Sequence, residues 1–308
     1  MIERDFFVAK YVTGYLGPYR LLNVVHTGHA SVIWQAYDDA ADRIVGVKTL
    51  LDLEKLDGEQ VHYLHREYTI GLKLKHATII EIYPCQWDRR QPYFAMEWFS
   101  APNLKQRLLQ SAERLVPLMP KIIDQASTAL SYLHRAGWVH CDVKPDNFLM
   151  TDDGQVKMID FALAKPIRRG LARWFARKTK VQGTKSYISP EQIRGGALDG
   201  RADLYSLACT IQELLSGKPP FTGVNSQELL TKHLRATPPP LEGLNPNITS
   251  EFGQLIRRCL AKNPDGRPET VDDFLREFRM MRLFKTNPNS NFCKRPANGT
   301  DKKQDGRS

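Results

Sequence analysis

The chain contains 308 residues with a formal net charge of +10, and its 42% hydrophobic and 25% charged residues are ordinary for a globular protein with a sizeable core. No apolar run approaches the roughly 18 residues needed to cross a bilayer. The first ten residues, M-I-E-R-D-F-F-V-A-K, carry acids where a signal peptide would have a positively charged region and then an apolar one. We therefore expect a cytoplasmic protein without a transmembrane segment.

The positive charge is confined to two segments. Residues 161–182 contain seven basic residues and no acid, and the tail 285–308 contains six basic and two acidic residues. Because the rest of the chain is nearly neutral, we expect no nucleic-acid partner. The five cysteines are scattered without a C-x-x-C pair, which argues against both a disulfide framework and a zinc site.

The first third of the chain is rich in β-type patterns. Residues 19–37 form two β-rich runs around a loop that contains Gly28, which predicts a hairpin, and the next strand ends at Lys48. A helix is expected around Glu67. Gly71, one turn later, should make this helix less stable than alanine would, by about 1 kcal/mol. Residues 93–99 are typical of a buried strand.

The middle of the chain is predicted to be helical over 104–110 and 117–136. In the second helix, apolar residues recur on one face, and Gly137 should end it in the left-handed conformation. These apolar residues are Ile122, Ala126, Leu130 and Leu133. The helix leads directly into the polar stretch 138–147.

That stretch, W-V-H-C-D-V-K-P-D-N, carries the chemistry. It places the carboxylate of Asp142, the ammonium of Lys144 and the carboxamide of Asn147 within six residues, and Asp160 follows in a short apolar run. Two acids with an amide between them suit Mg²⁺, which prefers oxygen ligands. A lysine beside an acid suits the neutralisation of a phosphate while the acid orients a hydroxyl. Alone, such a cluster is more often a solvated loop, so its meaning depends on the other motifs.

Those motifs occur in the order found in one family. The loop around Asp142, the pair Asp160-Phe161, the segment Q-G-T-K-S-Y-I-S-P-E and Arg267 together resemble the eukaryotic-type (Hanks-type) protein serine/threonine kinases, most of all the bacterial members. The resemblance implies an α+β bilobal fold over residues 19–282. A small β-rich N-lobe (19–98) with one regulatory helix would precede a larger, mainly helical C-lobe (99–282). Residues 1–18 would be a lead-in and 283–308 a disordered polar tail.

The resemblance also implies the reaction, which is transfer of the γ-phosphoryl group of ATP to Ser/Thr hydroxyls of protein substrates with Mg²⁺, or Mn²⁺ as an alternative. Asp142 would be the catalytic base, assisted by Lys144 and Asn147. Asn147 and Asp160 would hold the metal. The residues expected to bind ATP, together with Asp160, are Gly28, Val32, Lys48, Glu67, Met96, Glu97, Phe99, Asn103 and Leu149. Glu97 and Phe99 would use their main chain on the adenine, and Asn103 would reach the ribose.

Further positions are expected to support or regulate the site. Asp203 would hold the catalytic-loop backbone, Glu191 and Arg267 would form a structural ion pair, and Thr184 would contact Asp142 and Lys144. Thr179 is a candidate autophosphorylation site. The full set is His140, Cys141, Phe161, Thr179, Thr184, Glu191, Asp203 and Arg267.

The chain departs from the family pattern at several points. Cys141 replaces the arginine that usually receives an activation-loop phosphate, which implies activity without that switch. Ala162 replaces the glycine after Asp160-Phe161 and should restrict that loop. Only Gly28 remains of three phosphate-loop glycines, which should weaken the phosphate cover. Gly46, where alanine is usual, should leave more room above the adenine.

Two other functions fit parts of the pattern. A pseudokinase would keep the fold as an ATP-binding regulatory or scaffold module, but Lys48, Glu67, Asp142 and Asp160 are all present. A small-molecule phosphotransferase would lack the G-T-x-x-Y-x-x-P-E segment and its arginine partner. This chain has both, which favours a protein substrate.

The basic segment 165–180 also allows two interpretations. Leu171, Trp174 and Phe175 are interleaved with its arginines. It is either a solvated activation loop or an amphipathic element that recruits an acidic substrate, a partner or an anionic membrane surface.

Overall fold

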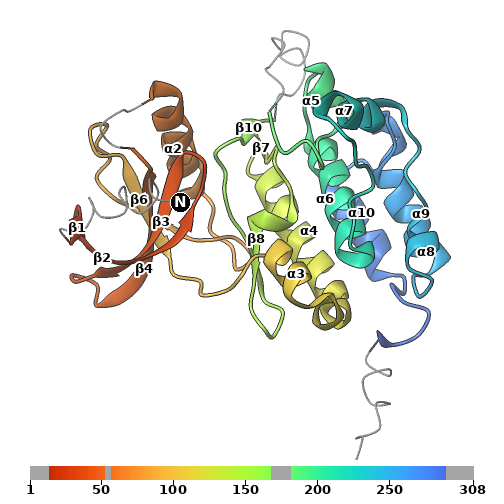
Figure 1. The fold of residues 1–308 in the computed structure, drawn as a ribbon, viewed down its shortest axis with the longest axis horizontal. Helices are drawn as coiled ribbons and strands as arrows, with labels where there is room; N and C mark the ends of the chain where they lie inside the picture. The colour runs from red at the N-terminus through yellow and green to blue at the C-terminus, as the bar shows by residue number, and fades with distance from the viewer. Residues whose placement is uncertain (1–13, 53–56, 168–181, 289–308) are drawn as a thin grey trace, which may run out of the picture.

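The computed structural model describes residues 14–52, 57–167 and 182–288, which form two lobes (Figure 1). One lobe is a curled antiparallel sheet with one helix, and the other is mainly helical. This is the α+β, two-lobed architecture that the sequence predicts. None of the helices in the described ranges is long and apolar enough to cross a membrane.

The smaller lobe contains a sheet with the strand order β1-β2-β3-β4-β6-β5. Its strands are β1 (Tyr15–Leu16), β2 (Tyr19–Thr27), β3 (Ser31–Asp38), β4 (Arg43–Leu50), β5 (Ile82–Tyr83) and β6 (Tyr93–Glu97). β3 alternates between buried and half-buried residues, whereas β4, inside the sheet, is buried over its last six residues. Val32 and Trp34 of β3 pack with Val45 and Val47 of β4 in one apolar cluster. Lys48 is therefore held in a rigid, buried strand.

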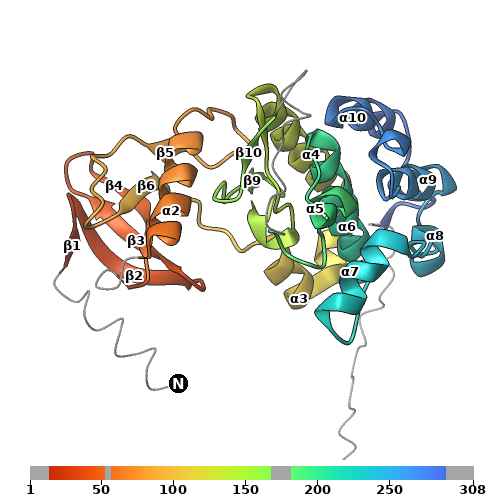
Figure 2. The same ribbon diagram turned by 90° about the horizontal axis from the view of Figure 1, so that it is seen from above.

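The single helix of this lobe, α2 (Gly58–Gly71), lies on the side of the sheet that faces the larger lobe (Figure 2). It begins at Asp57, whose side chain accepts a hydrogen bond from the N–H of Glu59. At its end, a Cβ added to Gly71 would lie 2.2 Å from Cδ1 of Ile82 in β5. Gly71 thus permits close packing of α2 on the sheet, which opposes the helix-propensity penalty expected from the sequence.

Replacement of Gly71 by alanine should lower the free energy of unfolding by about 1–3 kcal/mol, because overpacking costs more than the gain in helix propensity. Gly58→Ala is the matched control, since no atom lies within 4 Å of a Cβ at that position, and it should be neutral or stabilising. Urea unfolding of both variants measures the difference. A more stable Gly71→Ala variant would contradict the packing explanation.

The larger lobe is built around α6 (Gly200–Ser216), in which residues 202–215 are all buried. Its other helices are α3 (Leu104–Leu115), α4 (Met119–Arg135), α5 (Pro190–Arg194), α7 (Ser226–Arg235), α8 (Leu241–Leu244), α9 (Ser250–Cys259) and α10 (Val271–Arg279), with the short 3₁₀ turns η1 (Val116–Leu118), η2 (Pro145–Asn147) and η4 (Pro264–Gly266). The predicted apolar face of α4 is buried. Gly137 follows α4 with a φ of +90°.

Two small strand pairs flank the polar stretch 138–147. β7 (Trp138–Val139) pairs with β10 (Lys165–Pro166), and β8 (Phe148–Met150) pairs with β9 (Val156–Met158). The loop that carries Asp142 is therefore fixed at both ends by hydrogen-bonded strands. The pairs place it on the side of the larger lobe that faces α2 (Figure 2).

Packed residues extend beyond the predicted domain limits of 19 and 282. At the start, β1 pairs with β2. At the end, Leu283 is buried, Phe284 bridges to Ile248, and the N–H of Lys285 donates to the carbonyl of Asn247 at 2.7 Å. Residues 289–308 of the expected disordered tail lie outside the described ranges.

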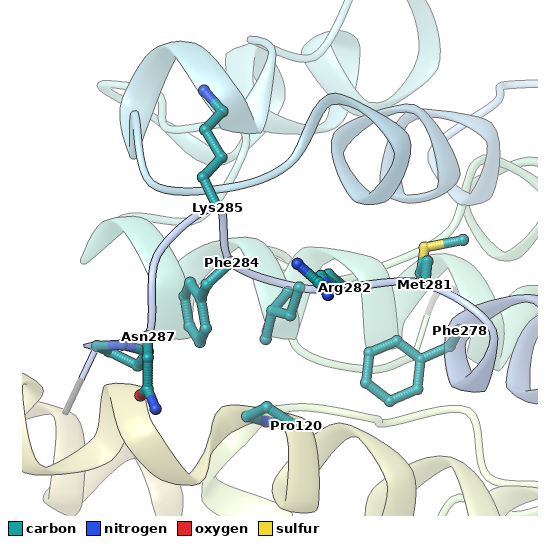
Figure 3. Close-up of a pocket in the computed structure, with 9 residues that line it drawn as sticks. Pro120, Phe278, Met281, Arg282, Phe284, Lys285 and Asn287 are labelled. Carbon is teal, nitrogen blue, oxygen red and sulfur yellow. The ribbon is translucent and has the colours of Figure 1, made fainter. Parts of the chain in front are cut away.

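The C-terminal segment also lines a groove of about 410 Å³ (Figure 3). Pro120 at the start of α4 and Phe278 of α10 form its other walls. None of the residues predicted from the sequence to be functional lines this groove.

Candidate active site

The loop that carries Asp142 is anchored by a buried carboxylate. Asp203, fully buried on α6, accepts hydrogen bonds from the N–H groups of His140 at 2.6 Å and Cys141 at 2.9 Å. Nε2 of His134 lies 2.8 Å from the same carboxylate. Cys141 has a φ of +66°, a strained conformation for a residue with a side chain, and these bonds hold it there.

Three close donors orient the carboxylate of Asp142, and Nδ2 of Asn147 lies 3.4 Å from its Oδ2. Lys144 Nζ lies 2.7 Å from Oδ2, and Oδ1 accepts from the N–H of Thr184 at 2.7 Å and from its hydroxyl at 2.9 Å. Lys144 also donates to the Thr184 hydroxyl at 2.9 Å. The structure thus brings Thr184 into contact with both residues, although it lies about forty positions later in the chain. This geometry keeps Asp142 in one orientation with a cation beside it.

The smaller lobe contributes a second set of charged side chains, Lys48 and Glu67, which lie near Asp160. Lys48 Nζ lies 2.7 Å from Glu67 Oε2 on α2 and 3.9 Å from Asp160 Oδ1. Burial lowers the pKa of Lys48, but the carboxylates of Asp160 and Glu67 outweigh it and the net pKa is raised. Burial raises the pKa of Asp160, but Lys48, the N–H of Ala162, His140 and Lys144 together outweigh it and the net pKa is lowered. Lys48 and Asp160 are therefore charged at neutral pH.

Glu67 behaves differently, because burial raises its pKa to about 7 despite the nearby lysine. Its carboxylate should gain a proton as the pH falls through neutrality, which would weaken the pair with Lys48. Any activity that depends on this pair should decrease on the acid side of about pH 7. A pH profile of kcat/KM for ATP measures this decrease, and Glu67→Gln should remove that limb. A profile that is flat from pH 8 to pH 6 would contradict the role of Glu67.

Asp160 begins a turn that continues through Phe161 and Ala162. It has a φ of +68°, and its Oδ1 accepts from the N–H of Ala162 at 3.2 Å. Phe161 is fully buried and lies edge-on to the ring of His140, with 5.9 Å between ring centroids. Phe161 and Ile70 of α2 both belong to the large buried cluster of the protein. The ring of Phe161 is therefore held in the core, next to the loop that carries Asp142.

The residues expected around a nucleotide lie between the lobes. Gly28 closes the β2–β3 hairpin, where its N–H donates to the carbonyl of Ser31 at 2.8 Å, and Val32 follows in β3. Met96 of β6 pairs in register with Gly46 of β4. A Cβ on Gly46 would lie 3.2 Å from Cγ and Cε of Met96. Met96 thus packs into the space that a side chain at position 46 would occupy, and extra room above an adenine stays a prediction.

In the segment that connects the lobes, Glu97 and Phe99 offer different main-chain groups to a ligand. The N–H of Glu97 donates to Glu81, so its carbonyl is the main-chain group that it can offer to a ligand. The carbonyl of Phe99 accepts from Ala101, which leaves its N–H for the same purpose. Lys157 Nζ of β9 lies 2.5 Å from Glu97 Oε1 and links this segment to the larger lobe.

Asn103, which is expected to reach the ribose, caps a helix in the structure. Its side-chain oxygen accepts from the N–H of Gln106 at 2.8 Å and caps α3, while Gln106 accepts from the N–H of Asn103. Only its amide nitrogen is left for a ribose. Leu149 in β8 forms an isolated β-bridge with Asn103.

A divalent metal fits the oxygen donors of this site. Asn147 donates its amide hydrogens to the carbonyl of Asp142 at 2.8 Å, so its side-chain oxygen is the atom available to a cation. Asp160 supplies a partly exposed carboxylate. Within the described ranges there is no cluster of three or more His, Cys, Asp or Glu side chains that could hold a metal. The protein would thus supply two ligands and leave the others to phosphates and water, as Mg²⁺ commonly requires.

Glu191 and Arg267 form a buried bidentate pair, with N···O distances of 2.7 and 2.9 Å. Arg267 also donates to the carbonyls of Ala261 and Arg201. Thr179 and most of the basic segment 165–180 lie outside the described residues, so the structure bears on neither of those predictions.

Sequence reasoning missed three neutral residues next to this site. Gln182 Nε2 lies 2.5 Å from the hydroxyl of Tyr63 on α2, and Gln192 Nε2 lies 2.8 Å from the carbonyl of Cys141. Glutamine and tyrosine fit many surfaces, and no spacing in the sequence identifies these positions.

Comparison with known proteins decides the family. The model of the protein kinase domain matches residues 19–278. The chain belongs to the protein kinase family. This confirms the resemblance to the Hanks-type kinases and the bilobal kinase fold. Members of the family use ATP and a divalent metal and act on proteins.

Named bacterial kinases are among the similar proteins. A probable serine/threonine-protein kinase of Streptomyces coelicolor is 34% identical over 83% of this chain and 39% of its own length. PrkC of Bacillus subtilis is 31% identical over 83% of this chain and 39% of its own length, and PknA of Mycobacterium tuberculosis is 33% identical over 80% and 57%. The kinase chain thus spans about two-fifths of the length of the first of these relatives.

Proposed function

We propose that this chain is an active protein serine/threonine kinase that transfers the γ-phosphoryl group of ATP to Ser/Thr hydroxyls of proteins. One observation supports this most strongly: the Lys48–Glu67 pair, at 2.7 Å, lies within 3.9 Å of Asp160. Such an arrangement costs desolvation energy at three charged groups and is useful for holding phosphates. The proposed domain spans 19–282, with β1 and residues 283–286 packed onto it.

Each residue then has a defined task. Asp142, oriented by Thr184 and Lys144, accepts the proton of the substrate hydroxyl as that oxygen attacks the γ-phosphorus. Lys144 neutralises charge on the transferred group, and Lys48 holds the α- and β-phosphates. Asn147 and Asp160 hold the metal, for which we propose Mg²⁺. When bound, the metal neutralises charge on the phosphate oxygens.

A pseudokinase function is the alternative, but it leaves this arrangement unexplained. A module that only binds ATP has no need for a carboxylate fixed by three donors at the position of Asp142. We also propose that the basic segment 165–180 favours acidic substrates, because its seven basic positions have no internal counter-charge.

Transfer of labelled γ-phosphate tests these proposals. Acidic casein and basic histone would be incubated with the kinase and labelled ATP in Mg²⁺, Mn²⁺ or EDTA, followed by phosphoamino-acid analysis. The proposal predicts phosphoserine or phosphothreonine in Mg²⁺, no label in EDTA, and more label on casein. No metal-dependent label on either protein, or on the kinase itself, would support the pseudokinase instead.

A further inference from the structure

Three consecutive residues after the basic segment contact both lobes. Gln182 Nε2 donates to the hydroxyl of Tyr63 in α2 at 2.5 Å, and the N–H of Thr184 donates to Asp142 at 2.7 Å. Between them, Gly183 has a φ of +109°, and an added Cβ would lie only 2.9 Å from the carbonyl oxygen of Cys141. This segment therefore joins α2 to the loop that carries Asp142.

We call residues 182–184 and their contacts with α2 and with the loop that carries Asp142 the joint. Gln192 fixes the end of the joint that lies against this loop. Its side chain is buried on α5, where its oxygen accepts from the N–H of Ser189 at 3.1 Å. Its nitrogen donates to the carbonyl of Cys141 at 2.8 Å, the same carbonyl that Gly183 contacts. Gln192 therefore holds the surface against which residues 182–184 pack.

At the α2 end of the joint, the direction of the hydrogen bond between Gln182 and Tyr63 is defined. The hydroxyl of Tyr63 lies 3.0 Å from Glu59 Oε1, and because a carboxylate can only accept, the tyrosine proton is committed there. Tyr63 must then accept from Gln182. Tyr63 lies one turn before Glu67, on the same face of α2. A movement of α2 that separated Lys48 from Glu67 would also break the Tyr63–Gln182 bond.

The joint itself carries no charge. Tyr63, Gln182 and Gln192 are neutral, and the side chain of Cys141 packs among Val139, Ala202 and other apolar residues. Burial raises the pKa of the Cys141 thiol far above neutrality. No cation at the Cys141 position can attract a phosphate here, so the contact between α2 and residues 182–184 depends on the hydrogen bond between Tyr63 and Gln182.

We propose that Tyr63 and Gln182 are positioning residues, whose hydrogen bond holds α2, and with it Glu67 and Lys48, in register with Asp142 without a phosphorylated activation segment. The proposal deepens the kinase function proposed above and rests on it. It assigns regulation of that site to a neutral contact that is present whether or not the chain is phosphorylated.

The test uses changes that keep the size of the side chain. Tyr63→Phe removes only the hydroxyl, and with it the bonds to Gln182 and Glu59, whereas Gln182→Met can neither donate to nor accept from the hydroxyl and removes the Tyr63–Gln182 bond alone. Each should lower kcat/KM for ATP about three- to tenfold, as expected for the loss of one hydrogen bond. The double variant should be no worse than Tyr63→Phe alone, because the Tyr63–Gln182 bond is already absent there. Phosphatase treatment should leave wild-type activity unchanged.

Tyr68→Phe is the matched control on the same helix. The Tyr68 hydroxyl bonds to Cys85 within the smaller lobe, at 2.8 Å to its carbonyl. This change should lower the melting temperature but leave kcat/KM within about twofold of wild type. Wild-type kinetics in Tyr63→Phe, multiplicative effects in the double variant, or loss of activity on phosphatase treatment would each overturn the proposal.

Hydrogen exchange separates this proposal from the kinase function itself. Gln182→Met should speed amide exchange in α2, although the changed residue lies more than one hundred positions away in the chain. If wild type transfers no phosphate, the proposed function fails and exchange still reports whether the joint holds α2. Unchanged exchange in α2 would overturn the joint, whatever the activity.

Discussion

Replacement of Lys48 by methionine should lower the rate of phosphoryl transfer by about 10²–10³-fold, the usual effect of removing one electrostatic contact in an active site. Methionine keeps the length and apolar stem of lysine but provides no charge for the phosphates. It also leaves Glu67 buried without its partner at 2.7 Å. The pKa of Glu67, already raised by burial, should rise further.

Lys75→Met provides the matched control in the same lobe. Lys75 forms an ion pair with Glu81, but both side chains are largely exposed, so the change should leave the transfer rate within about twofold of wild type. Initial rates at saturating protein substrate and varied ATP measure both variants. Equal losses in the two would mean that a general change in charge, and not the site, explains the effect.

Replacement of Arg267 by methionine should lower the free energy of unfolding by about 3–5 kcal/mol, because it leaves a buried carboxylate without its counter-charge. The Arg267 side chain is 0% exposed and that of Glu191 is 11% exposed. The variant also loses the bonds from Arg267 to two backbone carbonyls. This ion pair joins α5, next to residues 182–184, to the segment before α10.

Arg258→Met tests whether burial is the cause. Arg258 makes a similar two-bond contact with Glu277, but the two side chains are 50% and 39% exposed, so about 1 kcal/mol or less should be lost. The double variant Glu191→Leu, Arg267→Met should recover part of the stability, since no lone charge remains buried. Urea unfolding gives all three values. A loss at Arg267 no greater than at Arg258 would contradict the argument.

The charged part of the candidate site was predictable from the sequence. The roles proposed for Lys48, Asp142 and Asp160 depend on their own side-chain chemistry, and these residues occur in a fixed order with characteristic spacing. The fold class followed from the resemblance to the Hanks-type kinases that this order carries. The structure then places Lys48 Nζ 2.7 Å from Glu67 Oε2 and 3.9 Å from Asp160 Oδ1.

What the sequence did not predict depends on tertiary packing. Gly71 is an unfavourable helix residue in isolation, and only the position of Ile82 explains it. Gly46 and Met96 likewise fill one space together, although they come from different strands. The contact of Gln182 with Tyr63 joins segments 119 residues apart through side chains that carry no motif. Such pairs follow from the fold and cannot be derived from local patterns.

The central claim is that Asp142 acts as the catalytic base, and the most direct test is single-turnover phosphoryl transfer by Asp142→Asn. Asparagine keeps an oxygen acceptor for Thr184 but cannot take a proton. The account predicts a transfer rate lower by about 10²–10⁴-fold, with ATP affinity close to that of wild type. Equal transfer rates for Asp142→Asn and wild type would contradict it.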